Sequence, residues 1–324
     1  TSFAYGDIDI STESVTDGYF VRNEILTDLG VKTGDKVLAI NGEKVTTVYG
    51  IRKQLIAAEV ITIENDEGIK DITLPEDFLG QLSGSDDRSF FELRFPFVVG
   101  AVADSSLNKS VDLKERDIIT SINGEPLKYF DEIEERLKPL ANQTVEVEIL
   151  RDNQTLIRDL EVNSDGKLGI ISGGGNLTDL ENVGYYKIIR KEYDLVESFG
   201  VGLTKFVDQI AGYGVQLKKI FTPSTGAYKG VGGFKAIYDI FPDTWSWEFF
   251  WSITAFLSIM LGVLNLLPIP ALDGGHVMFL LYEIISGRKP SEKFLERAQV
   301  VGFFILIALV VFANGNDIFK AVFK

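Results

Sequence analysis

The 324-residue sequence has no cysteine, one histidine (His276) and two methionines. Without cysteine, the chain forms no disulfide bond and offers no thiolate to a metal ion or to a substrate. With a single histidine, its own residues cannot build a multi-histidine metal site. No basic stretch followed by a short apolar run lies near Thr1, so no secretory signal peptide is visible. These absences exclude disulfide-stabilised domains, thiol enzymes and cysteine-ligated metal sites.

The charge of the chain is divided unevenly along its length. The net charge is −15, but residues 1–198 hold 21 Lys and Arg against 38 Asp and Glu, whereas residues 199–324 hold 11 against 9. An acidic surface repels phosphate backbones, so we exclude nucleic acid as a partner. The first part is expected to face water, and the apolar, nearly neutral second part is expected to lie in a lipid bilayer.

Two long segments carry no charged side chain. Residues 249–272 form one such run of 24 residues, and residues 298–316 form another of 19. Because a helix needs about 20 apolar residues to cross a bilayer, both are predicted to be transmembrane; buried helices of a soluble core are the alternative. The segment between them is basic, which predicts that it is cytoplasmic and that residues 1–198 lie on the other side. Its basic residues are Arg288, Lys289, Lys293 and Arg297.

A motif in the first half of the chain occurs twice. Residues 32–42 read KTGDKVLAING and residues 114–124 read KERDIITSING, an offset of 82 residues. Each copy has an acidic residue, an alternating strand and an Asn-Gly turn, in which glycine tolerates positive φ. Further elements are predicted after each copy: strands at 60–64 and 69–74, then a helix at 129–140 and strands at 144–150 and 155–162.

This repeat predicts two domains of one fold, because each copy is long enough to bury a core of its own. The pattern resembles PDZ domains. The resemblance implies an α+β sandwich whose groove accepts an extended peptide by strand addition. Two packing domains that bind no peptide are the alternative, and the sequence does not choose between them.

An amphipathic segment follows the repeat. Its apolar residues fall on one helical face: Phe199, Leu203, Phe206, Ile210, Tyr213, Leu217 and Ile220. Lysines and an aspartate interrupt the segment. It is too charged for a span that faces lipid on all sides. We expect a helix at the membrane interface, with an ordinary helix packed on protein as the alternative.

The first apolar segment ends in the motif NLLPIPALDGGH, residues 265–276. Pro268 and Pro270 cannot lie in an unbroken helix, so the backbone should unwind from about Pro268 to Asp273. Unwound backbone at membrane depth requires surrounding protein or water. A carboxylate in a membrane segment is costly and is usually functional. Helix should resume over residues 277–285, and an N-cap role for Asp273 is the alternative reading of that carboxylate.

The motif resembles the Asn-x-x-Pro-x-Pro-x-Leu-Asp-Gly segment of site-2 proteases. The order of tandem PDZ-like domains, interfacial helix, motif and one more span is similar to the bacterial regulator-of-sigma-E type of that family. The resemblance implies an intramembrane zinc metalloprotease that cleaves transmembrane segments during regulated intramembrane proteolysis. Its partners would be the lipid bilayer and membrane-anchored substrates, either anti-sigma-factor-like proteins or signal-peptide remnants. It would lie in the bacterial inner membrane as a multi-pass protein.

The resemblance also implies roles for individual residues. Asp273 would be the third protein ligand of a catalytic Zn²⁺. Asn265 would bind substrate, and the segment containing Pro268, Pro270 and Leu272 would offer backbone groups to an unwound substrate helix. His276 is expected to pack near the site without ligating the metal.

One departure from the family is plain, because the family's HExxH segment is absent from this sequence. We expect an N-terminal truncation, so that the chain carries no catalytic residue and is inactive alone. A non-catalytic membrane scaffold with PDZ-like domains is the alternative. A transporter or channel is a third reading, because broken helices with an acidic residue occur there too.

The predicted organisation is therefore two PDZ-like α+β domains, an interfacial helix and α-helical transmembrane segments. The predicted boundaries are a remnant at 1–13, PDZ-like domains at 14–80 and 90–171, a linker at 172–194, the interfacial helix at 195–222, and membrane segments at 245–286 and 297–316.

Overall fold

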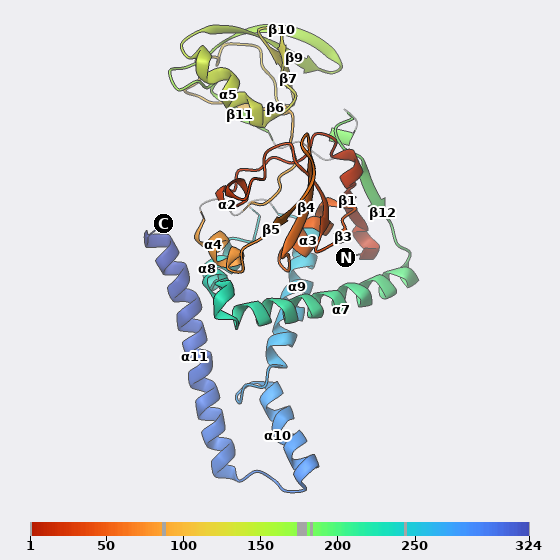
Figure 1. The fold of residues 1–324 in the computed structure, drawn as a ribbon, viewed down its shortest axis with the longest axis vertical. Coiled ribbons are helices and arrows are strands. Elements are labelled where there is room, and N and C mark those ends of the chain that lie inside the picture. Colours follow the sequence, from red (N-terminus) through yellow and green to blue (C-terminus); the bar gives the residue numbers. More distant parts are fainter. Residues whose placement is uncertain (1, 86–88, 174–179, 182–183, 243–244, 324) are drawn as a thin grey trace.

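The structure is a computed structural model that describes residues 2–85, 89–173, 180–181, 184–242 and 245–323. Two β-sheet regions follow each other along the long axis of the molecule, and a helical region lies beyond them (Figure 1). A long helix, α7, runs crosswise between the sheets and the remaining long helices. The loop that joins the last two helices is at the opposite end from the sheets.

The first sheet is antiparallel, with the strand order β3-β2-β4-β5. Its helices are short, and α3 joins β3 to β4 as the repeat predicts. The bounds are α2 Glu24–Asp28, β2 Lys36–Ile40, β3 Glu43–Lys44, α3 Val48–Leu55, β4 Val60–Asn65, β5 Gly68–Thr73 and α4 Phe78–Gly84.

The second sheet has the order β10-β9-β7-β6-β11, with β8 paired to β7. The predicted helix at 129–140 is divided into a 3-10 turn, a short α-helix and a second 3-10 turn. The second 3-10 turn contains Pro139, which lacks the backbone donor that a continuing α-helix needs. The bounds are β6 Phe97–Val102, β7 Ile118–Ile122, β8 Glu125–Pro126, η2 Phe130–Glu132, α5 Ile133–Leu137, η3 Lys138–Leu140, β9 Thr144–Arg151, β10 Gln154–Glu161 and β11 Ile170–Ser172.

The two copies of the motif have the same local structure. Asn41 and Asn123 have φ of 51° and 50°, and the glycines after them are also positive. Asn41 Oδ1 accepts hydrogen bonds from the amides of Glu59 and Val60, and Asn123 Oδ1 accepts one from Glu146. Each asparagine thus joins its turn to the strand that begins after the helix. The Asn-Gly turns predicted from the sequence are confirmed.

The two sheets have separate hydrophobic cores. The first contains residues between Ile10 and Leu93, together with Leu180 and Tyr186, and the second contains residues between Phe97 and Leu168. The first core therefore takes side chains from the predicted linker at 172–194. Residues 188–191 of that predicted linker form a strand.

Residues that flank the repeat form a small sheet of their own. β1 (Asp7–Ile10) pairs antiparallel with β12 (Ile188–Lys191), which ties the start of the chain to the segment before α7. β1 lies within the predicted remnant at 1–13, and its last residue, Ile10, is buried. The strand has only four residues, so its alternation of polar and apolar side chains is too short to reveal a strand in the sequence. Its partner is also about 180 residues away in the sequence.

Polar contacts connect the two sheets. Asp17, in the first core region, accepts hydrogen bonds from Lys128 Nζ at 2.5 Å and from Tyr129 Oη at 3.0 Å. Arg94 lies between the sheets, and its guanidinium pairs with Asp131 at 2.7 Å and packs over the Tyr129 ring. The Tyr186 hydroxyl donates to the Arg94 carbonyl.

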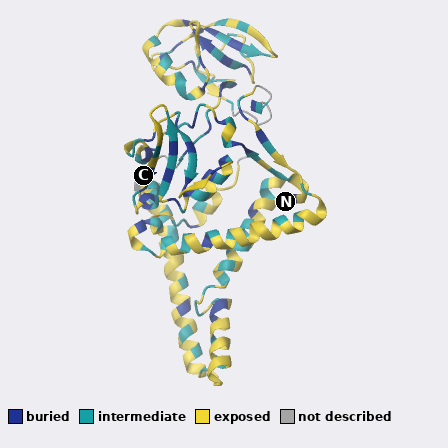
Figure 2. Ribbon diagram, turned by 45° about the vertical axis from the view of Figure 1, so that its right-hand side comes forward, coloured by how far each residue is buried: buried dark blue, intermediate teal, exposed yellow. Residues whose placement is uncertain are grey.

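The helical region begins with α7 (Leu195–Ile220), whose Asp194 and Glu197 form a capping box. The other helices are α8 Phe234–Tyr238, α9 Trp247–Asn265, α10 Asp273–Ser286 and α11 Glu292–Phe323. By length and composition, α9 and residues 292–322 of α11 can cross a membrane. Almost no residue of either helix is buried within this chain (Figure 2), unlike the residues of helices in a soluble core. α11 extends beyond the predicted span at 297–316.

Candidate functional site

The predicted break in the first apolar segment lies between α9, which ends at Asn265, and α10, which begins at Asp273. Within it, the Leu272 amide donates to the Ile269 carbonyl at 2.9 Å, which closes a four-residue turn. Pro270 is the second residue of this turn. Ala271 is the third, with a φ of 110°. A type II turn requires positive φ at its third position and favours proline at its second. The break is therefore an ordered turn, with strain at Ala271.

Glycines allow the break to fold back on the start of α10. A Cβ on Gly274 would lie 2.4 Å from the carbonyl oxygens of Leu266 and Leu267, and a Cβ on Gly275 would lie 2.5 Å from that of Ile269. Any larger residue would push these backbones apart. The contact between Gly274 and Leu266 brings their neighbours, Asp273 and Asn265, to the same junction of the two helices.

The alternative reading of Asp273 as a helix N-cap is wrong. The N-cap residue of α10 is Leu272, which is extended with φ −107° and ψ 165°, and Asp273 is the first helical residue. No side chain makes a capping hydrogen bond there. The reason is the turn at Ile269–Leu272, after which the helix begins at Asp273, one residue earlier than an N-cap role for Asp273 would need.

The side chains of the motif have few partners. Asp273 is exposed, Asn265 is half-buried, and neither side chain has a hydrogen bond or ion pair among the described residues. The Pro268 carbonyl likewise accepts no hydrogen bond in the described part of the chain. His276 lies one turn after Asp273, and its ring packs edge-on against Phe279. The carboxylate and the amide are thus free to bind something that this chain does not contain.

An unpaired carboxylate at this position needs a compensating charge if α9 and α10 lie in a bilayer. A charged side chain at the centre of a membrane helix costs at least about 2.5–3.5 kcal/mol. The dipole of α10 stabilises a negative charge at its N-terminus by about 0.3–1 kcal/mol, or by up to about 2 kcal/mol in favourable geometry. The deficit favours a bound cation, because no lysine or arginine lies within residues 249–287.

The residues present do not by themselves fit a zinc ion. Catalytic zinc takes three protein ligands and leaves a fourth position open. Among the described residues, no three His, Asp or Glu side chains lie together as a metal site. Asp273 fits one of these ligand positions, since carboxylate oxygens bind zinc beside nitrogen ligands. Within the described residues, Asp273 has no second or third ligand beside it.

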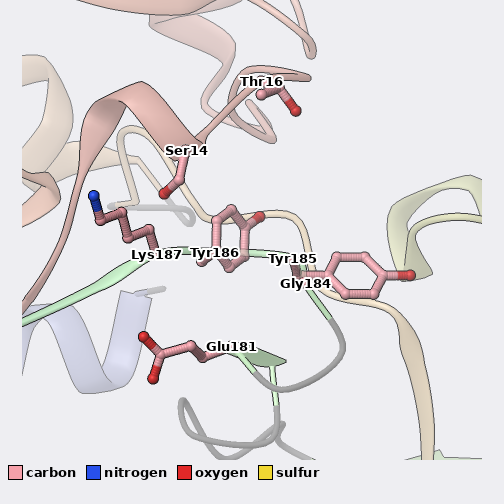
Figure 3. Close-up of a pocket in the computed structure, with 7 residues that line it drawn as sticks. All are labelled: Ser14, Thr16, Glu181, Gly184, Tyr185, Tyr186 and Lys187. Carbon is pink, nitrogen blue, oxygen red and sulfur yellow. The ribbon is translucent and has the colours of Figure 1, made fainter.

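Two pockets of the described residues lie away from the motif. One of about 420 Å³ is lined by Ser14, Thr16, Glu181, Gly184, Tyr185, Tyr186 and Lys187 (Figure 3). Its Tyr185 hydroxyl donates to the Lys128 carbonyl, and Glu181 pairs with Arg190 at 2.6 Å. These groups hold the segment before β12 against its neighbours. The residues that line the pocket therefore have a structural role, and we do not assign a binding site there.

One contact of the break was not found from the sequence. Gly302 of α11 lies directly against Pro270, since a Cβ there would be 1.4 Å from the Pro270 carbonyl oxygen. The sequence offers only a glycine inside an apolar run, about 30 residues after the motif. No local pattern reveals such a contact.

The comparison with protein families agrees with the motif. The family described as peptidase family M50 matches residues 35–309, which is most of the chain and includes the whole break. The chain belongs to peptidase family M50. The resemblance to site-2 proteases, predicted from residues 265–276, is confirmed at the level of the family.

Two curated relatives of this M50 chain illustrate the similarity. The regulator of sigma-W protease RasP of Bacillus subtilis is 31% identical over 228 residues, which are 68% of this chain and 50% of RasP. The zinc metalloprotease RasP of Shouchella clausii is 29% identical over 224 residues, which are 67% of this chain and 50% of that protein. The M50 chain thus spans about half the length of these relatives.

A solved structure is also similar to part of the chain. The PDZ domain of an SdrC-like protein, Lin2157, from Listeria innocua matches with 18% identity and a TM-score of 0.22. The match covers 25% of this chain and 97% of that domain.

Proposed function

We propose that the protein containing this chain is an intramembrane zinc metalloprotease that cleaves transmembrane segments of membrane-anchored substrates. The observation that carries the proposal is the ordered break between two apolar helices, which presents a carboxylate without a partner at its end. Membership of peptidase family M50 supports the same activity.

In this proposal Asp273 is one zinc ligand, and the other ligands come from an HExxH segment outside these 324 residues. Asp273 would hold the metal together with those ligands, and the chemistry that zinc would supply there is the activation of water for hydrolysis. Asn265, at the other side of the helix junction, would hold substrate backbone through its free amide. Pro268, Pro270 and Leu272 would shape the surface on which a substrate helix unwinds, and the free Pro268 carbonyl offers an acceptor there.

The arrangement of α7 supports its assignment to the membrane interface. Its polar side is held to the small β1–β12 sheet by Lys205, which pairs with Asp7 at 2.5 Å, and to α3 by Asp208, which pairs with Lys53 at 2.7 Å. In the first half of the helix the large apolar side chains from Phe199 to Ile210 remain exposed, with Phe199 at 77%, whereas Tyr213 is buried. A helix held in this way presents its apolar side away from the sheets and toward a bilayer.

The positions of the tryptophans support a membrane surface at the level of α7. All three tryptophans of the chain lie at the start of α9, at positions 245, 247 and 251, and all are exposed. Tryptophan is enriched at membrane interfaces, where its ring meets the headgroups. We infer that the two sheets are PDZ-like domains outside the cytoplasm, and that the loop from α10 to α11 is cytoplasmic.

The substrate class follows from the family and from the name of one relative. The Bacillus subtilis relative is named a regulator of sigma-W protease. We infer that this protein likewise acts on membrane-anchored proteins of the anti-sigma-factor class or on signal-peptide remnants.

The test is cleavage of a membrane-embedded reporter by the full-length protein. Asp273→Asn keeps the size of the side chain and removes its charge, so cleavage should be lost. Asn265→Ala should reduce cleavage while zinc stays bound. Asp239→Asn is the matched control, because Asp239, the residue that follows α8, forms an exposed pair with Lys235. Normal cleavage by Asp273→Asn, with Asp239→Asn also normal, would refute the proposed function.

A further inference from the structure

Helix α11 contacts the rest of the chain at few places. Of its described residues, Gly302 alone is buried, although Val301 and Phe303 beside it are more than half exposed. α11 approaches the break at this point, and its C-terminal end returns to the level of α8 (Figure 1). The buried glycine therefore marks a specific contact on a helix that is otherwise open to its surroundings.

The contact at Gly302 involves backbone that cannot easily move. A Cβ added there would lie 1.4 Å from the Pro270 carbonyl oxygen, 2.4 Å from the carbonyl carbon and 3.2 Å from the Ala271 Cβ. Gly275 contacts the same turn from α10, since its Cβ would lie 2.7 Å from the Pro270 Cα. The turn is held between two glycines on two helices. A larger residue at 302 must therefore push the turn against the first turn of α10, which carries Asp273.

The position of α11 along its own axis is fixed at its other end. Asp317 Oδ2 accepts hydrogen bonds from the amides of Gly233 at 2.9 Å and Ala236 at 3.3 Å. Asn316 Nδ2 donates to the carbonyls of Lys229 at 2.8 Å and Val231 at 2.6 Å. Because Gly302 is 15 residues before Asp317, about 22 Å of helix separates these hydrogen bonds from the contact with Pro270.

The loop that holds α11 is itself packed on the first sheet region. A Cβ on Gly80 of α4 would lie 2.7 Å from the Gly226 Cα, so α4 and the segment before α8 touch through glycine as well. Glu76 also accepts a hydrogen bond from Ser224 at 2.5 Å. α11 thus runs from a segment anchored on the first sheet region to the break.

We propose that Gly302 is a positioning residue for the site at the break: it lets α11 support the Pro270–Ala271 turn and so sets where Asp273 and Asn265 lie. This inference rests on the proposed function. Gly302 touches neither substrate nor metal in this account. It acts through the turn, and the polar contacts at Asn316 and Asp317 determine which residue of α11 faces that turn.

The first test compares glycine variants of the full-length protein. Gly302→Ala should lower kcat for the membrane-embedded reporter about 100-fold, because a misplacement of about 1 Å can cost that much. Gly315→Ala is the matched control, since Gly315 is in the same helix and a Cβ there meets nothing within 4 Å. Both changes raise helix propensity equally. The control should cleave at the rate of the unchanged protein.

The second test asks whether the effect passes through the turn. Ala271→Gly removes the Cβ that would lie 3.2 Å from the new one and relieves the positive φ. Combined with Gly302→Ala, it should restore kcat at least tenfold and slow the loss of zinc to a chelator. A role in α11 alone would show no such rescue. If the Gly302→Ala protein does not accumulate in the membrane, the double variant should accumulate. If the double variant does not accumulate either, the proposal is contradicted.

The outcomes separate the two proposals. If Asp273→Asn abolishes cleavage but Gly302→Ala equals Gly315→Ala, the positioning role is wrong and the proposed function stands. Suppose that Gly302→Ala abolishes cleavage but that adding Ala271→Gly neither restores it nor changes the rate at which zinc is lost to a chelator. The positioning role of Gly302 is then also refuted. If Asp273→Asn cleaves normally, the proposed function itself fails.

Discussion

The second sheet contains a buried ion pair that offers a quantitative test of the fold. Asp117 is only 1% exposed, and both of its oxygens accept hydrogen bonds from Arg151 at 2.7 Å. Its Oδ2 also accepts the Lys114 amide at 2.8 Å. Arg151 has a second, exposed partner in Asp112 at 2.9 Å. The pair joins the loop before β7 to the end of β9.

Asp117→Asn should destabilise a soluble piece spanning residues 90–171 by about 2–4 kcal/mol. Breaking a buried pair costs about 3–5 kcal/mol when the remaining charge is left alone. Here the loss is smaller, because Arg151 keeps Asp112 and an asparagine oxygen can still accept the Lys114 amide. For a domain of this size, the loss should lower Tm by at least about 8 °C.

The effect should depend on pH in a defined direction. Burial alone would raise the pKa of Asp117, but hydrogen bonds from Arg151 and from the Lys114 amide hold it below its ordinary value. A depressed carboxyl pKa stabilises the folded state above the unfolded pKa of about 3.9 and loses this contribution as pH falls through the folded pKa. The difference between the original and Asp117→Asn proteins should therefore be full at pH 7 and shrink below about pH 4.

The assay is denaturant unfolding followed by circular dichroism at several pH values. Asp112→Asn is the control, because Asp112 is 57% exposed and pairs with the same arginine, so its loss should cost much less stability than the loss of Asp117. A single cooperative transition is expected for all three proteins. Equal losses for the two variants, or a difference that does not change with pH, would refute the reasoning. A disordered spectrum for residues 90–171 would remove the two-domain interpretation.

Two further predictions concern the arrangement of the parts. Cysteines introduced at Ser164 and Ser291 of the full-length protein should differ, with an impermeant reagent on intact cells labelling position 164 and not 291; the opposite result would reverse the proposed topology. Asp17→Asn removes the negative charge that pairs with Lys128, so the distance distribution between one spin label on each sheet should broaden. An unchanged distribution would mean that this contact does not fix the orientation of the sheets.

Local chemistry made part of the fold predictable. The Asn-Gly turns at residues 41–42 and 123–124 were predictable because the φ > 0 conformation and the asparagine hydrogen bond depend on residues within one motif. The break at residues 266–272 was predictable because proline lacks the donor that a helix interior needs. In both cases the controlling residues are neighbours in the sequence.

Contacts between distant segments were not predictable in the same way. The pairing of β1 with β12 and the hydrogen bonds of Asp17 with Lys128 depend on how separate regions pack. Gly302 was missed for the same reason. The N-cap interpretation of Asp273 failed on a finer point, because capping requires the extended residue to be the acidic one, and here it is Leu272.

The central claim is that Asp273 binds zinc in the complete protein, and zinc content tests it most directly. Metal analysis of the purified full-length protein should give one zinc per chain, and Asp273→Asn should lose most of it while Asp239→Asn keeps it. The 324-residue chain alone should hold no stoichiometric zinc, because it supplies one of three protein ligands. Full zinc occupancy in the full-length Asp273→Asn protein would contradict the account.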